Sequence, residues 1–117
     1  MPVGPPTHQQ LGMLHGGASA ALAEMTGSMG AYLSIDRDKF FCVGLDLKIN
    51  HLRAVRSGFV FAKAEPVHKG MQTQVWQIRT RDENREMVAL STLTMAVLPL
   101  DHKMKNVIGD IFKKLQQ

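Results

Sequence analysis

The sequence predicts an α+β fold in which one antiparallel sheet wraps around a single long helix. The first observation behind this prediction is a run of small and apolar residues at 16–33, which is typical of a helix buried on nearly every side. The second is that the hydrophobic period changes to two after residue 39, where four strand-like segments joined by short turns follow. Short connections favour antiparallel neighbours, and a sheet around the helix would cover its apolar surface.

Each expected element has its own signal. Residues 1–14 carry three prolines and form an irregular lead-in, and the helix is expected from His15 or Gly16 to about Ser34. Its several glycines suggest close packing against another backbone. The four strands are expected at about 43–50, 58–66, 72–81 and 86–98. The first should bury Val43, Leu45, Leu47 and Ile49 on one face, and the third should turn Gln74, Trp76, Ile78 and Thr80 to one face.

The end of the chain predicts a short amphipathic helix at 105–116. Its apolar stripe consists of Val107, Ile108, Ile111, Phe112 and Leu115. We expect this helix to pack on its own fold or on a subunit, because it is short for a helix that binds a membrane surface. The chain is therefore interpreted as one domain, 1–117, with a helical extension at 103–117.

Composition excludes several classes of function. The net charge is +4, but there are few aromatic residues and no nucleic-acid motif, so we expect no nucleic-acid partner. No segment is apolar enough to span a membrane, and the N-terminus lacks the pattern of a signal peptide, so a cytoplasmic location and no membrane partner are expected. One cysteine excludes an internal disulfide, and the five histidines are scattered, so neither a metal site nor a cofactor is expected.

Glu24 is the most informative residue. It is the only Asp, Glu, Lys or Arg in the first 35 residues, and it stands in the middle of the small and apolar run. Burying an unpaired carboxylate is costly, and such groups cluster at active sites. Glu24 alone is equally compatible with a structural carboxylate that bonds elsewhere in the core.

Gly16 and Gly17 stand at the expected helix start, where free N–H groups and the helix dipole favour negative charge. They are candidate donors to a carbonyl oxygen, or simply glycines required by the turn. Gly16 and Glu24 are eight residues apart, about 12 Å along a helix. If both serve one reaction, they come from different copies of the chain, which predicts a dimer with sites across its interface.

Two neighbours have less specific signals. Ser28 lies four residues after Glu24, so its hydroxyl either holds a water near the carboxylate or bonds back to the Glu24 carbonyl. His15 is able to donate to a substrate, although a lone histidine more often has a structural role.

Several segments, in order, resemble the hotdog-fold acyl-CoA thioesterases. They are residues 9–24 with His15-Gly-Gly-Ala-Ser19 at their centre, 43–53, 66–70 and 74–78, and the resemblance covers about 7–98. The nearest likeness is to the small bacterial aromatic acyl-CoA type, which includes 4-hydroxybenzoyl-CoA and dihydroxynaphthoyl-CoA thioesterases and the enterobactin-pathway proofreading thioesterase. The resemblance implies a hotdog fold, a small acyl-CoA substrate, coenzyme A only as part of that substrate, and a homodimer that pairs into a homotetramer.

The resemblance also implies residue roles. Glu24 would be the nucleophile or the base for water, and Gly16 the backbone donor to the thioester oxygen. Gln9 would help to place the carbonyl or the water, His15 would lie beside the thioester, and Ser28 would assist the water. Contacts to coenzyme A would come from His51, Arg53, His68, Lys69, Gly70 and Met71.

The sequence departs from the family in two places. Relatives usually carry a first strand before the segment at 5–11, and here only residues 1–3 correspond to it, so we expect an unpaired sheet edge. The helix after Pro99 is the second departure, and it is expected to cover exposed apolar surface, including any left by the missing strand. A hotdog protein that binds acyl-CoA without hydrolysing it, or that serves as an assembly subunit, is the alternative. A dehydratase is disfavoured because its histidine motif is absent.

Overall fold

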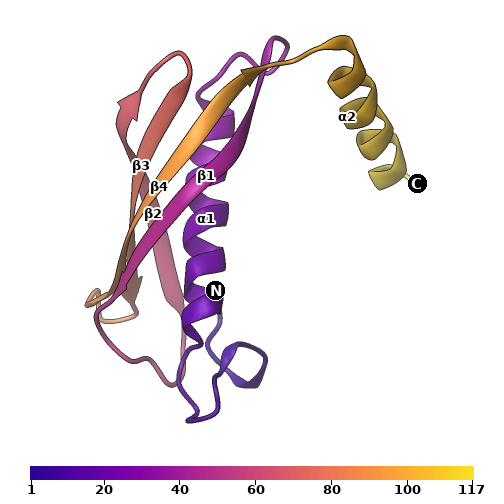
Figure 1. The fold of residues 1–117 in the computed structure, drawn as a ribbon. Coiled ribbons are helices and arrows are strands. Elements are labelled where there is room, and N and C mark those ends of the chain that lie inside the picture. The colour runs from indigo at the N-terminus through magenta and orange to yellow at the C-terminus, as the bar shows by residue number, and fades with distance from the viewer.

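The computed structural model describes all residues 1–117 and contains two α-helices and four strands. Figure 1 shows their arrangement along the chain. After a short 3₁₀ turn at Pro5–Thr7, the elements are α1 (Gly16–Leu33), β1 (Phe40–His51), β2 (Val60–Lys69), β3 (Thr73–Asp82), β4 (Met87–Pro99) and α2 (His102–Leu115). No helix has the length and apolar character that a membrane crossing requires.

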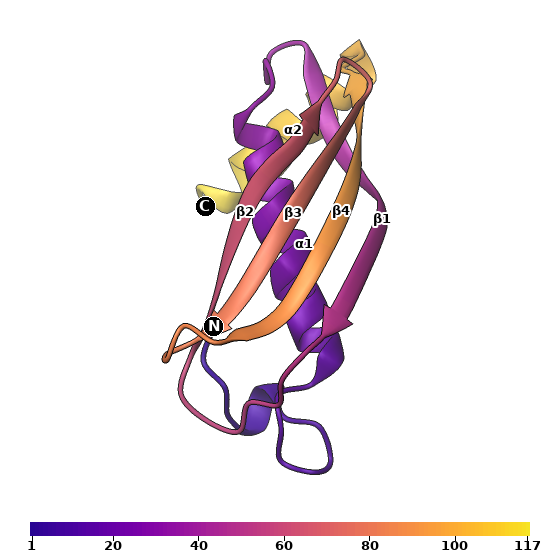
Figure 2. The ribbon, with the colours of Figure 1, turned by 90° about the vertical axis from the view of Figure 1, so that its left-hand side faces the viewer.

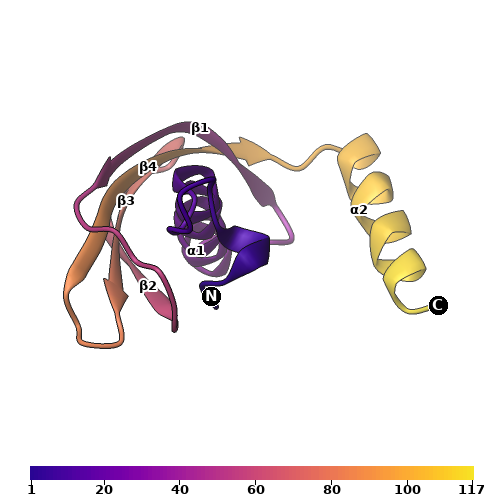
Figure 3. The ribbon, with the colours of Figure 1, turned by 90° about the horizontal axis from the view of Figure 1, so that it is seen from below.

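The four strands form one antiparallel sheet in the order β1-β4-β3-β2. Figure 2 shows α1 running across the sheet, and Figure 3 shows the sheet curving around it. The predicted architecture, an antiparallel sheet wrapped around one long helix, is therefore confirmed. The boundaries of α1 agree with the prediction to within one or two residues.

The main core lies between α1 and the inner face of the sheet. Ala23 and Ala31 pack against Trp76, Ile78 and Leu93, all of which are buried. The helix approaches closely because glycines face the bulkiest side chains: a methyl group at Gly27 would lie 2.6 Å from Leu93 Cδ2, and one at Gly30 would lie 2.8 Å from Trp76 Cζ3. These glycines thus pack against side chains of the sheet, whereas the sequence suggested contact with another backbone.

Strand β1 changes its inward face at an irregularity in its pairing with β4 between Gly44 and Asp46. A bulge adds one residue to one strand and reverses which residues point inward after it. Cys42 before the bulge and Leu47 after it both pack against the core, while Leu45 is 62% exposed. The prediction that Val43 and Leu45 share the buried face of Leu47 is therefore wrong.

The helix α1 is buried on one face only. Ser19, Ala23, Gly27 and Ala31 are its buried residues, while Met25 is 70% exposed and Met29 and Leu33 are also exposed. The sheet covers one side of the helix and leaves the other open (Figure 3). The expectation of a helix buried on nearly every side is thus wrong for the single chain, and so is the expected burial of Glu24, which is exposed.

The two edges of the sheet differ. Met1 and Val3 form backbone hydrogen bonds with Val60 and Gly58, at the start of β2. Beyond that point the outer edge of β2 is unpaired, as predicted, and Phe61 on it is exposed. The other edge is β1, whose outer side has no neighbouring strand.

The helix α2 stands away from the sheet on the side of β1 (Figures 1 and 3). Asp101 caps it, because its Oδ1 accepts from the Met104 N–H at 2.7 Å. None of its residues is buried. It begins at His102, three residues earlier than predicted, and it does not lie on the β2 edge, so the expectation that it covers surface left there is wrong for the single chain.

Candidate active site

A cleft of about 340 Å³ lies at the start of α1. Four of the candidate residues line it together: Gln9, Gly16, His51 and Arg53. They come from the lead-in, from the first residue of α1, and from the end of β1 and the loop that follows it. The fold thus gathers residues that are far apart in the sequence around the start of a helix.

Gly16 is the first residue of α1, and its N–H has no acceptor within the chain. The neighbouring Gly17 N–H is already used, because it donates to His15 Nδ1 at 2.8 Å. That bond makes Nδ1 the unprotonated nitrogen of the His15 ring, so the neutral ring carries its proton on Nε2. The helix start therefore has a free backbone donor at Gly16, supported by the positive end of the helix dipole.

The walls of the cleft hold polar groups near this donor. A methyl group at Gly16 would lie 3.2 Å from His51 Nε2, so the imidazole packs directly over the glycine. Gln9 accepts the Leu11 and Met13 N–H groups through Oε1. This leaves the amide nitrogen of Gln9 free to donate to a group in the cleft.

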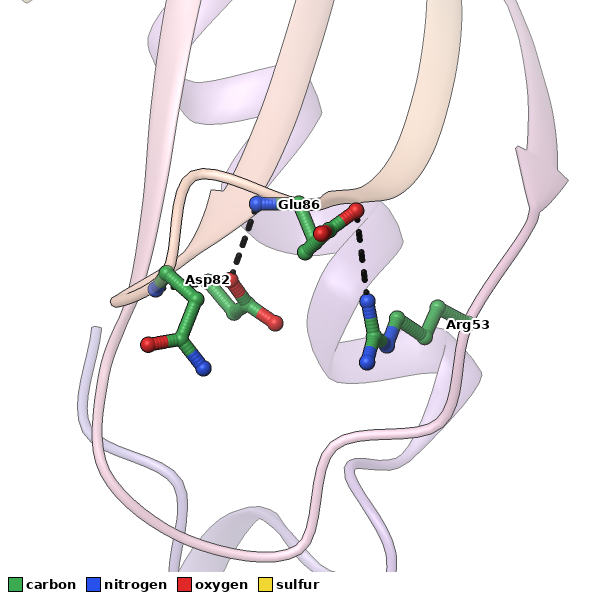
Figure 4. A network of polar contacts seen from close by, with 4 residues as sticks. Arg53, Asp82 and Glu86 are labelled. Atoms are coloured by element: carbon green, nitrogen blue, oxygen red, sulfur yellow. Dashed lines mark hydrogen bonds and ion pairs between the residues drawn. The ribbon is translucent and has the colours of Figure 1, made fainter.

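Arg53 also lines the cleft, and its charge is partly matched within the chain. Its guanidinium lies 3.3 Å from Glu86 Oε2 in an exposed ion pair. Glu86 is itself held by the turn before β4, because Asp82 Oδ1 accepts the Glu86 N–H at 3.0 Å (Figure 4). An exposed pair of this kind is weak, so a phosphate is able to compete for Arg53.

Glu24 lies two turns further along α1, outside the cleft. Its carboxylate faces β1 at the bulge, where a methyl group at Gly44 would come within 3.1 Å of Oε1. It forms no hydrogen bond or ion pair within the chain. The Glu24 carboxylate is thus exposed and has no hydrogen-bond or ion-pair partner in the chain. It lies beside Gly44 of β1, which has no side chain.

Ser28, one turn after Glu24, points toward the sheet. Its hydroxyl lies 3.8 Å from Met95 Sδ and bonds neither to the Glu24 carboxylate nor back to the Glu24 carbonyl. The back-bonding that spacing suggested at Ser28 occurs instead at Thr26, whose hydroxyl donates to Leu22 O at 2.7 Å.

The remaining candidates lie at the opposite end of α1. His68, Lys69, Gly70 and Met71 belong to the β2–β3 hairpin and line a cavity of about 730 Å³ together with Ser34 and Gln74. Within one chain, the fold therefore separates the candidates into three places: the cleft at the start of α1, the carboxylate in its middle and the hairpin at its end.

Sequence reasoning missed Gly44. The available signal was a glycine inside a strand, which often marks a bulge or a close approach by another group. The alternating pattern around Gly44 predicts a plain strand and indicates neither the bulge nor the contact with Glu24.

Two further features bear on the chemistry. Burial raises the pKa of the Cys42 thiol above its usual value, so this residue is a poor nucleophile at neutral pH. No group of His, Cys, Asp or Glu side chains is arranged to hold a metal ion.

Comparison with known proteins assigns this arrangement to a family. The model of the Thioesterase superfamily matches residues 11–89. The chain belongs to this superfamily. A crystal structure of a mutant thioesterase from Pseudomonas aeruginosa is similar to it with a TM-score of 0.84 and 49% identity, covering 86% of this chain and 72% of that chain.

Two relatives in the thioesterase superfamily extend the comparison. A Vibrio cholerae protein named as an esterase is 55% identical over 97 residues, which is 83% of this chain and 64% of that protein. The 1,4-dihydroxy-2-naphthoyl-CoA hydrolase of Listeria monocytogenes is 44% identical over 90 residues, which is 77% of this chain and 72% of that protein. The chain thus spans 64% to 72% of the length of these relatives.

Membership in the thioesterase superfamily confirms the family predicted from residues 9–24 and the segments after them. It also confirms the hotdog fold, since the helix wrapped by the antiparallel sheet superposes on a thioesterase structure. The comparisons place the chain among hydrolases of thioesters.

Proposed function

We propose that the protein hydrolyses the thioester bond of a small acyl-CoA, with an aromatic acyl group favoured. The observation that carries this proposal is the Gly16 N–H, which is free at the start of α1 inside a cleft lined by His51 and Gln9. A free N–H at the positive end of a helix is suited to a carbonyl oxygen that gains negative charge. The thioesterase superfamily provides the reaction class for this donor.

The reaction begins with the thioester oxygen accepting the Gly16 N–H. Attack on the carbonyl carbon moves an electron pair to this oxygen, and the donor and the helix dipole stabilise the resulting negative charge. Gln9 and His15 Nε2–H are further donors that orient the carbonyl or the water. The intermediate then collapses, the C–S bond breaks, and the thiolate of coenzyme A leaves and takes up a proton.

Glu24 is proposed either to activate the attacking water or to attack the carbonyl carbon itself. As a general base, its carboxylate takes a proton from a water whose oxygen attacks the carbonyl carbon. As a nucleophile, it forms an anhydride with the acyl group, which water then hydrolyses. Both routes suit a carboxylate that is exposed and free of partners. Ser28 lies one turn after Glu24 on α1, and its hydroxyl is proposed to assist the attacking water.

The distance between these groups calls for two chains. Gly16 and Glu24 both lie on α1, eight residues apart, so about 12 Å separates them along the axis. The open face of α1 and the free edge of β1 supply the exposed apolar residues that a dimer would cover, including Met25, Met29 and Leu45. We therefore propose a homodimer with Gly16 and Glu24 of each site on different protomers, and a homotetramer of two dimers.

The charged residues near the candidate sites and the relatives support the proposed substrate class. Arg53 and His51 at the cleft, and His68, Lys69, Gly70 and Met71 at the hairpin, are proposed to contact coenzyme A, with cations meeting its phosphates. The Listeria relative is named as a hydrolase of an aromatic acyl-CoA. This supports an aryl acyl group over a long aliphatic one.

The experiment that tests this function measures hydrolysis of benzoyl-CoA, phenylacetyl-CoA and hexanoyl-CoA by the wild type and by Glu24→Gln. The variant keeps the shape of the side chain and removes its charge. We expect kcat to fall about 100-fold for a general base, and further for a nucleophile. Unchanged turnover in Glu24→Gln would exclude this mechanism. Absence of turnover in a folded, dimeric wild type would favour the alternative, a hotdog protein that binds acyl-CoA without hydrolysing it.

A further inference from the structure

Ser19 is a buried serine of α1 that the proposed reaction does not use. It is 2% exposed and lies on the helix face that packs against the sheet. Its hydroxyl oxygen is buried and has no hydrogen-bond partner in the chain. A buried hydroxyl without a partner costs free energy, so such a group in a folded protein calls for an explanation.

The usual acceptor for a serine hydroxyl inside a helix is the carbonyl four residues earlier. For Ser19 that acceptor is His15 O, which accepts the backbone N–H of Ser19 at 3.1 Å but no bond from its hydroxyl. Thr26 on the same helix does form this kind of bond, because its hydroxyl donates to Leu22 O at 2.7 Å. The Ser19 hydroxyl is therefore available to an acceptor that comes from outside the chain.

Ser19 lines the cleft of about 340 Å³ at the start of α1, together with Gly16. The two residues are three positions apart, so they lie on one side of the helix, about 4.5 Å apart along its axis. The Cα–Cβ bond of a helical residue tilts toward the N-terminus, so the Ser19 side chain leans back toward the turn that holds the free Gly16 N–H. The hydroxyl and this N–H thus approach the same part of the cleft.

The cleft contains several hydrogen-bond donors and no acidic side chain. Besides Gly16 and Ser19, its polar residues are Gln9, His51 and Arg53, and the rest of its lining is apolar. A group that enters beside Ser19 is therefore matched best if it carries an acceptor oxygen. Negative charge on that oxygen would strengthen the hydrogen bonds that it accepts.

We infer that the Ser19 hydroxyl is a second donor to the thioester oxygen, beside the Gly16 N–H. A carbonyl oxygen has two lone pairs, so one accepts the backbone N–H and the other accepts the hydroxyl. The second bond gains strength when attack on the carbonyl carbon puts negative charge on this oxygen, and the hydroxyl keeps its proton throughout. This inference rests on the proposed acyl-CoA function and assigns a further residue to its reaction.

Ser91 provides a matched control for Ser19. Its hydroxyl, on the inner face of β4, is also buried and has no partner, but Ser91 does not line the cleft. Replacing either serine by alanine removes a buried polar atom and leaves no other group unsatisfied, so we expect both variants to fold and to be at least as stable as the wild type. A difference in activity between them then reports on where the hydroxyl lies rather than on folding.

The first test compares the hydrolysis of benzoyl-CoA by Ser19→Ala and by Ser91→Ala. We expect the kcat of Ser19→Ala to be about 10- to 100-fold below that of Ser91→Ala, with KM little changed, because the lost bond is strongest in the transition state. Ser19→Cys fills nearly the same volume, but its thiol is a weak donor, so it should be as slow as Ser19→Ala. Equal kcat values for the two alanine variants, or a wild-type kcat in Ser19→Cys, would overturn the inference.

The second test observes the thioester carbonyl without turnover. Glu24→Gln serves as the background, and benzoyl-CoA carries a heavy carbon isotope at the thioester carbonyl, so that its stretching band is identified in infrared difference spectra. A hydrogen bond lowers the stretching frequency of a carbonyl. We expect the shift on binding to be smaller when Ser19→Ala is added to this background than when Ser91→Ala is added. Equal shifts in the two double variants would contradict a bond from Ser19.

Together these measurements separate the Ser19 donor from the proposed function. If the wild type hydrolyses benzoyl-CoA but neither test distinguishes Ser19→Ala from Ser91→Ala, the function stands and the Ser19 donor fails. If the wild type hydrolyses no thioester but the carbonyl shift depends on Ser19, the proposed function fails and the donor stands.

Discussion

Two glycines leave room for other groups at the candidate active site, each in a different way. Gly16 has a free N–H at the start of α1 and lies directly beneath the His51 ring. Gly44 has no side chain where the Glu24 carboxylate rests against β1. A side chain at Gly16 would displace the His51 ring, and one at Gly44 would displace the Glu24 carboxylate. The proposed reaction therefore depends on these two glycines as well as on the reacting side chains.

The role of the Gly16 N–H is testable with a matched pair of variants. Gly16→Pro removes the donor, and proline is well tolerated at the first position of a helix. His15 before it is extended, with φ −66° and ψ 131°, which suits a residue that precedes proline. Gly16→Ala keeps the N–H while adding the same Cβ near His51. We expect Gly16→Pro to have a kcat on benzoyl-CoA about 100-fold below that of Gly16→Ala, the loss typical of one oxyanion donor. Equal rates would exclude the N–H as a donor.

Cys42 provides a prediction about pH. Burial raises the pKa of its thiol in the folded protein, so the folded state holds this proton more tightly than the unfolded chain. The resulting stabilisation is present below the thiol pKa of the unfolded chain and is lost as the pH rises through the folded value. We expect alkylation by iodoacetamide, followed by mass spectrometry, to reach its half-maximal rate at a higher pH in the folded protein than in urea. Coincident pH profiles would contradict this.

At the scale of the elements, the inward face of the regular strand β3 is predictable from the sequence, whereas the bulge in β1 is not. The inward positions of β3 were predicted correctly, because Gln74, Ile78 and Thr80 continue one alternation without interruption and are buried. On β1 the same rule failed at Gly44, since a bulge depends on pairing with β4, and pairing is not visible in the segment itself. Similarly, the periodicity of α1 does not reveal which side the sheet covers.

The packing of α1 against the sheet predicts the effect of a small substitution. In Gly27→Ala the new methyl group would lie 2.6 Å from Leu93 Cδ2 and 3.1 Å from Ile78 Cδ1. Overpacking of this kind costs about 1–3 kcal/mol, which exceeds the gain of about 1 kcal/mol in helix propensity. We expect a lower free energy of unfolding in urea.

Gly109→Ala is the control for Gly27→Ala. Gly109 lies on α2 with no atom within 4 Å of the new methyl group, so only the gain in propensity remains. We expect this variant to be as stable as the wild type or more so. Stabilisation by Gly27→Ala would show that α1 and the sheet are less tightly packed than the distances indicate.

At the scale of the whole molecule, one chain holds the candidate residues in separate places. The sequence led to Gln9, Gly16, His51 and Arg53 as candidates, and the fold brings these four to one cleft. The sequence did not reveal where Glu24 lies relative to these four, since it is on the same helix as Gly16 but outside the cleft, with its carboxylate against Gly44. Residues that meet only across an interface share no contact within the chain, so neither spacing nor the fold of one protomer reveals their geometry.

A mixing experiment tests the two-chain site directly. Glu24→Gln and Gly16→Pro each damage both sites of a homodimer. When the two variants are unfolded together and refolded as a mixture, a mixed dimer has one site with Gly16 from one chain and Glu24 from the other. We expect about a quarter of the wild-type activity on benzoyl-CoA, because half of the dimers are mixed and each has one intact site of two. Refolding each variant alone is the control and should restore nothing. A mixture as inactive as its components, with mixed dimers demonstrated by native mass spectrometry, would show that each site takes both residues from one chain.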